Sequence, residues 1–101
     1  MSYHKDKIAK RKAMTAKLDA AFAASDQEEV RLELATMLLA VNKEFLPEYE
    51  NNVHGFKPEL AQSLATLTRK QIARLEHVIA LAQSGHSIAN INLLGDRSEA
   101  Q

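Results

Sequence analysis

The chain has 101 residues, no cysteine, and thirteen basic side chains against thirteen acidic ones. This length supports one hydrophobic core, and the lack of cysteine excludes a disulfide framework and a thiolate metal site. No apolar run approaches the ~18 residues of a membrane span, and residues 1–12 are too polar for a signal peptide. We therefore expect an intact cytoplasmic protein with no membrane partner. The net charge of zero argues against a chain built wholly around nucleic acid.

The zero net charge is a cancellation between segments. Residues 1–17 carry a balance of +5, residues 18–56 a balance of −6, and the remainder is nearly neutral. A basic segment is thus followed by an acidic one, which raises the question of whether the two pair with each other or with something else.

An alanine-rich stretch predicts a first helix at about 5–24. Its apolar stripe is narrow and consists of Met14, Leu18, Ala21 and Phe22. The basic charges of this segment are candidates for contact with a partner: Lys5, Lys7, Lys10, Arg11 and Lys12. They could neutralise phosphates of a nucleic acid. Alternatively, in an antiparallel hairpin Lys7 or Arg11 comes near Glu44, and the pairs neutralise each other within the chain.

A central helix is predicted over about 26–46. Ser25 and Glu28 have the spacing of a capping box, and Pro47 is expected to end or kink the helix. One face repeats large apolar residues at helical spacing: Val30, Leu34, Met37, Leu38, Val41 and Phe45. The stripes before and after Ser25 lie on nearly opposite sides of a continuous helical wheel. We prefer a break at Ser25 and an antiparallel hairpin. One long helix, packed on opposite sides against partner helices in a dimer, would have the same spacing of apolar residues.

Arg31 and Asn42 fall inside the apolar arc of the central helix, about three turns apart. They could set the register of an interface, as a buried Asn does in coiled coils. Alternatively, they mark the edge of the buried face, with the Arg31 stem on apolar surface and its head in water.

A third helix is predicted over about 58–84, with Pro58 at its first turn and Gly85 just past its end. Its apolar face comprises Leu60, Leu64, Leu67, Ile72, Leu75, Val78, Ile79 and Ala82. The fold class is therefore all-α: a bundle of three main helices over 1–85, followed by a tail over 86–101. Because the central apolar arc is wider than the narrow first stripe can cover, we expect a homodimer to complete the bundle.

The tail contains a short apolar segment at 88–94, whose large members are Ile88, Ile91, Leu93 and Leu94. Such a segment is too short to be a stable helix alone. It could bind a groove or sheet edge of another protein, or dock back on its own bundle or a second copy.

Catalytic patterns find little support. The four histidines lack ligand spacing, and the three glycines are isolated, so we expect no metal, no cofactor and no small-molecule substrate. The first hypothesis is a non-enzymatic, regulatory interaction module, an adaptor or inhibitor that binds a larger protein assembly. The alternative is a nucleic-acid-associated regulator that uses the basic first helix. A metal-dependent enzyme is a third hypothesis.

Overall fold

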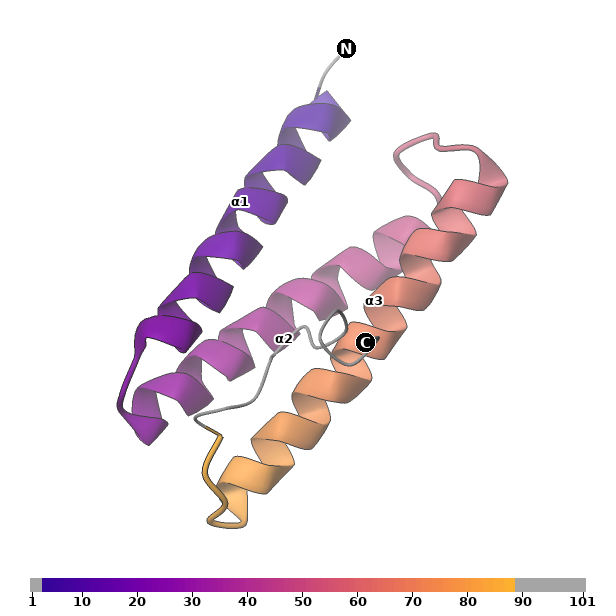
Figure 1. The fold of residues 1–101 in the computed structure, drawn as a ribbon. Coiled ribbons are helices and arrows are strands. Elements are labelled where there is room, and N and C mark those ends of the chain that lie inside the picture. Colours follow the sequence, from indigo (N-terminus) through magenta and orange to yellow (C-terminus); the bar gives the residue numbers. More distant parts are fainter. Residues whose placement is uncertain (1–2, 89–101) are drawn as a thin grey trace, which may run out of the picture.

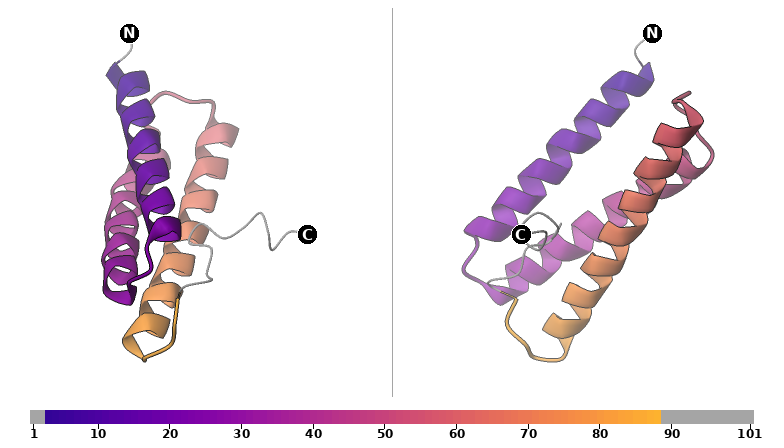
Figure 2. Two further views of the ribbon diagram at one scale, coloured as in Figure 1. Left: turned by 60° about the vertical axis from the view of Figure 1, so that its left-hand side comes forward. Right: turned by 45° about the vertical axis from the view of Figure 1, so that its right-hand side comes forward.

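The computed structural model describes residues 3–88, with side chains from Lys5 onward. It contains three helices within that range: α1 (Tyr3–Ala24), α2 (Glu28–Glu50) and α3 (Pro58–Gln83). Each helix runs antiparallel to the one before it, as Figure 1 shows. Helix α2 packs against both α1 and α3, and Figure 2 shows the three helices of this bundle from two further sides. The predicted all-α bundle and its antiparallel hairpin are therefore confirmed.

Most of the large buried side chains gather where α1 ends and α3 ends. Phe22 of α1, Leu38 of α2, and Leu75 and Val78 of α3 pack together there, and Ile88 joins them after the last helix. At the opposite end of the bundle, α3 presents small buried residues to its neighbours. These are Ala61, Ala65 and Thr68. Small side chains allow helix backbones to approach closely, and α2 packs more closely against α3 than against α1.

The central helix begins later than predicted. It starts at Glu28, and Gln27 is its N-cap without a side-chain capping bond. The Ser25 hydroxyl accepts the Gln27 N–H at 3.2 Å, which holds the turn after α1. The expected capping box does not form because the Glu28 carboxylate bonds to the segment after α3.

The same helix also ends later than predicted, at Glu50, with Pro47 inside it. Its end is closed at Asn52, whose φ of 49° places it in the left-handed region. There the Asn52 N–H bonds to the Tyr49 carbonyl at 3.1 Å and the Val53 N–H to the Glu48 carbonyl at 3.1 Å, the hydrogen-bond pattern of a Schellman motif. The loss of one hydrogen bond at Pro47 is offset by the contacts that Glu48 and Tyr49 make in helical conformation.

The end of α3 follows the prediction. Gly85 has a φ of 91°, its N–H bonds to the Ala82 carbonyl at 3.1 Å, and the His86 N–H bonds to the Leu81 carbonyl at 3.0 Å. Glycine adopts this left-handed conformation without the steric cost that a Cβ imposes.

Candidate functional site

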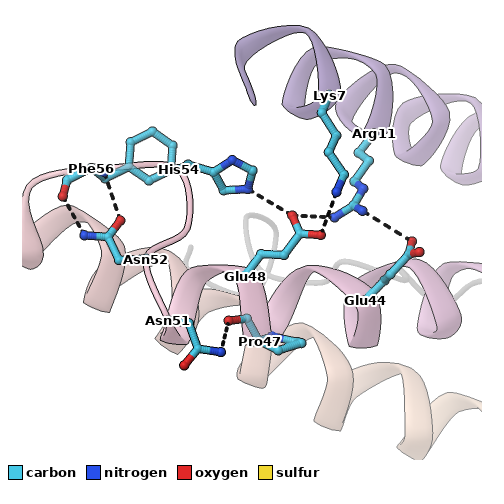
Figure 3. Close-up of polar contacts among 9 residues, drawn as sticks. All are labelled: Lys7, Arg11, Glu44, Pro47, Glu48, Asn51, Asn52, His54 and Phe56. Atoms are coloured by element: carbon cyan, nitrogen blue, oxygen red, sulfur yellow. Dashed lines mark hydrogen bonds and ion pairs between the residues drawn. The ribbon is translucent and has the colours of Figure 1, made fainter. Parts of the chain in front are cut away.

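Two members of the basic segment turn toward α2. The Lys7 ammonium lies 3.1 Å from one Glu48 oxygen, and the Arg11 guanidinium lies 2.8 Å from the other. Arg11 also reaches Glu44, one turn earlier on α2, at 3.7 Å. Figure 3 shows both basic side chains extending from α1 to these two carboxylates. The pairing of Arg11 with Glu44 is the one expected for an antiparallel hairpin.

The other three basic candidates, Lys5, Lys10 and Lys12, are exposed. On a helical wheel Lys10 lies well apart from Lys5 and Lys12, so the three do not form one basic stripe. The structure thus divides the basic segment into two residues that join α1 to α2 and three that face solvent.

Glu48 receives a third polar contact, from the loop after α2. The His54 Nε2 lies 2.9 Å from the carboxylate, and the His54 side chain is only 2% exposed. The loop is held in turn by Asn52, whose side chain accepts the Phe56 N–H at 2.9 Å and donates to the Phe56 carbonyl at 2.7 Å. Glu48 therefore ties α1, α2 and the loop together (Figure 3).

The electrostatics of this cluster favour an ionised carboxylate. Burial raises the pKa of Glu48, but hydrogen bonds from Arg11, Lys7 and His54 outweigh it and leave the pKa below 4.5. The Arg11 guanidinium also lies 4.9 Å from the centre of the Phe45 ring, a cation–π distance. The charges of this cluster pair with each other and hold α1 against α2. Part of the separation between basic and acidic segments in the sequence is therefore explained by pairing within the chain.

The first half of α3 presents its leucines outward. Leu60 is 47% exposed and Leu67 is 44% exposed, although Ala61 and Ala65 on the neighbouring stripe are buried. Leu64 lies between the two leucines and is half-buried. We call these three residues, Leu60, Leu64 and Leu67, the leucine row.

The leucine row was predicted to face the core, and that prediction is wrong. The apolar stripe of α3 faces the core in the second half of the helix, where Leu75 and Val78 are fully buried. In the first half, α3 turns its small residues toward the bundle instead. The alternation of alanine and leucine at 60–61 and 64–65 was the available signal, because small residues mark close approach between helices.

Other predicted core residues are also partly exposed. Met14 is 48% exposed on α1, and Met37 is 48% and Val30 37% exposed on α2. Met14 is a single exposed residue on α1, which is ordinary for a protein surface, whereas Val30 and Met37 lie two turns apart on the same face of α2.

One side of the leucine row carries charges that have no ion-pair partner among the described residues. Glu59 and Lys70 are both exposed, and both lie about a quarter-turn to the same side of the row on a helical wheel. Glu59, Ser63, Leu67 and Lys70 also contribute to the wall of an open hollow on the surface. The first half of α3 thus combines exposed apolar side chains with charged side chains that make no ion pair within residues 3–88.

The start of the tail is attached to the bundle. Ile88 is fully buried, and its N–H donates to the Glu28 carboxylate at 3.0 Å. The same carboxylate accepts the Ser87 hydroxyl at 3.2 Å and the Arg31 guanidinium at 2.5 Å. The Ile88 N–H is the largest cause of a lowered pKa at Glu28. Ile88 thus occupies the core of its own chain, whereas Ile91, Leu93 and Leu94 lie outside the described residues.

Both candidates for interface register have partners within the chain. Asn42 is 2% exposed, and its side-chain amide donates to the Leu38 carbonyl at 2.9 Å. Arg31 bonds to Glu28 and to the Ser25 carbonyl. Arg31 therefore braces the turn before α2, and Asn42 lies inside the helical bundle.

Comparisons of the chain with protein-family models, curated proteins and solved structures found no match. Within residues 3–88, none of the helices combines the length and the apolar character needed to cross a membrane. In the same part of the chain, no three histidine, aspartate or glutamate side chains gather in a way that could hold a metal ion.

Proposed function

We propose that this chain is a non-enzymatic, cytoplasmic interaction module, an adaptor or inhibitor that binds a helical apolar surface of a protein through the leucine row. The observation that carries the proposal is the exposure of Leu60 and Leu67 next to buried Ala61 and Ala65. A helix that turns its largest apolar side chains to solvent and its smallest to the core has a second face available for packing.

Helix-on-helix binding is the recognition mode that suits this face. The members of the row are spaced four and three residues apart, the spacing with which one helix face packs against another. A partner helix covering the row would remove about half of two leucine side chains from water, worth roughly 1 kcal/mol for each leucine. The leucine row is thus the centre of a modest interface.

The proposal is tested with the double substitution Leu60→Gln and Leu67→Gln. Because both positions are half exposed, we expect the free energy of unfolding to fall by less than about 1 kcal/mol per site, against about 2–5 kcal/mol for the buried control Leu38→Ala. A photo-crosslinking side chain at Ser63 should form a specific adduct with a protein, and the double substitution should abolish it. The same crosslinker at the exposed His77 is the matched control.

Two results would contradict the proposed function. The leucine substitutions could destabilise the chain as much as Leu38→Ala, which would mean that the chain covers its own leucine row. Alternatively, the adduct at Ser63 could persist in the double variant, which would mean that the row does not make the contact.

A nucleic-acid-associated role is a second proposal, supported by the exposure of Lys5, Lys10 and Lys12. Replacing all three by Ala should reduce the slope of binding to duplex DNA or RNA against salt concentration. Replacing Lys7 and Arg11 should instead lower stability, because these two residues pair with Glu48. Lack of binding at low salt would exclude this role.

A further inference from the structure

We propose that the occupant of the leucine row is a second copy of this chain, packed antiparallel so that Leu64 faces Leu64 of that copy. This inference rests on the proposed function, because it names the partner of the same surface. Its support is the arrangement of apolar and charged residues along the first half of α3.

The leucine row is nearly symmetric about Leu64. At about 1.5 Å per residue, Leu60 lies about 6 Å to one side of Leu64 and Leu67 about 4.5 Å to the other. If a second α3 runs antiparallel with the two Leu64 residues opposite each other, each Leu60 falls within about 1.5 Å, along the axis, of a Leu67 from the other copy. The row is therefore complementary to itself, as a two-fold interface requires.

The charges follow the same symmetry. Glu59 lies about 7.5 Å to one side of Leu64 and Lys70 about 9 Å to the other. In the antiparallel arrangement each Glu59 comes next to a Lys70 of the other copy, again with an axial offset of about 1.5 Å. Both residues lie on the same flank of the row, and in an antiparallel helix pair the same flanks of the two helices face each other.

The parallel arrangement is disfavoured by the same residues. In a parallel two-fold pair, opposite flanks of the two helices face each other, so Glu59 and Lys70 of one copy would lie on the far side from those of the other and would make no pairs. Glu59 and Lys70 have no ion-pair partner within residues 3–88, so both are available to a second chain. Charge thus selects the antiparallel orientation, and the leucines supply the apolar contact.

The size of the row predicts a weak dimer. It covers only about two turns of helix, so the buried surface falls below the ~1,200 Å² at the lower end of specific, stable interfaces. We therefore expect a reversible equilibrium between monomer and dimer with a dissociation constant of about 0.1–1 mM.

The test is sedimentation velocity of the full chain over a concentration series, with charge-reversal variants. Glu59→Lys and Lys70→Glu should each weaken dimerisation about tenfold, because each variant creates two like-charged pairs in the symmetric dimer. The double variant Glu59→Lys/Lys70→Glu should restore the dissociation constant to within about threefold of the original. Glu29→Lys and Lys17→Glu change the charge equally at exposed positions elsewhere, and they should leave the dissociation constant unchanged.

Three outcomes would contradict the proposal in whole or in part. A chain that stays monomeric up to millimolar concentration would show that a second copy does not occupy the leucine row. In that case, an adduct between the crosslinker at Ser63 and a different protein would still support the proposed function. A double variant no tighter than the single variants would refute the antiparallel register. A third outcome would overturn the occupant and the proposed function together: a monomeric full chain that dimerises only after Ile91, Leu93 and Leu94 are replaced by Ser would assign the row to the chain's own tail.

Discussion

The burial of Ile88 leads to a quantitative prediction for the substitution Ile88→Ala. The side chain is fully buried in the cluster that contains Phe22, Leu38 and Val78. The substitution removes three carbon groups, each worth about 0.8 kcal/mol when buried, and it leaves a cavity that the surrounding helices fill only in part. We expect the free energy of unfolding to fall by about 2–4 kcal/mol, a large share of the ~5–15 kcal/mol that stabilises an ordinary domain.

The assay is urea unfolding followed by the helical circular dichroism signal. For a chain of this size a loss of this magnitude should lower the unfolding midpoint by about 1–4 M urea. The matched control is His86→Ala, two residues earlier, where the side chain is exposed and the expected change is below about 0.5 kcal/mol. If Ile88→Ala shifts the midpoint no more than His86→Ala does, Ile88 does not belong to the core, and the bundle ends at Gly85.

Three further predictions concern the end of α2. Glu48→Gln should lower the free energy of unfolding at neutral pH by about 1–3 kcal/mol. Because the folded pKa of Glu48 lies below 4.5, the carboxylate stabilises the fold above about pH 4.5, and this stabilisation is lost as the pH falls through the folded pKa. The difference in unfolding free energy between wild type and variant should therefore shrink when unfolding is measured at acid pH. Burial raises the pKa of Tyr49 above 10.0, so the neutral phenol contributes to stability below about pH 10 and this contribution is lost as the pH rises further. Tyr49→Phe should therefore lose less unfolding free energy than wild type at alkaline pH. An equal loss in the two proteins would contradict this. Pro47→Ala restores a helical N–H and should raise the thermal midpoint by an amount equivalent to about 1–3 kcal/mol, whereas a lower midpoint would show that the proline ring makes contacts worth more than the hydrogen bond.

The helices themselves were predictable because their signals are local. Apolar spacing located all three, and the conformational freedom of glycine placed the end of α3 at Gly85. The positions of Ser25 and Pro47 were also informative, but each was outweighed by contacts distant in the sequence. Glu28 bonds to Ile88 rather than closing a capping box, and α2 continues past Pro47 to Glu50.

The candidate surfaces were predictable only in part. The sequence alone showed that a basic segment precedes an acidic one, and that Arg11 could meet Glu44 in a hairpin. It did not show that Glu48 would collect Lys7, Arg11 and His54, because that cluster requires α2 to remain helical beyond Pro47. The end of α2, four residues later than predicted, therefore decided that Lys7 and Arg11 pair with Glu48.

The sequence by itself determined the class of fold and the separation of charge, since both follow from residue spacing along the chain. The tertiary structure decided between an antiparallel hairpin and one long helix through Ser25, because both fitted the same residue spacing. Tertiary structure decided which part of the apolar stripe of α3 is buried. Leu75 and Val78 meet Phe22 and Ile88 in the core. Within residues 3–88 no helix covers the leucine row, because α3 approaches α2 through its alanines. Periodicity identifies an apolar face, but only the packing of neighbouring helices determines how much of that face remains available to another molecule.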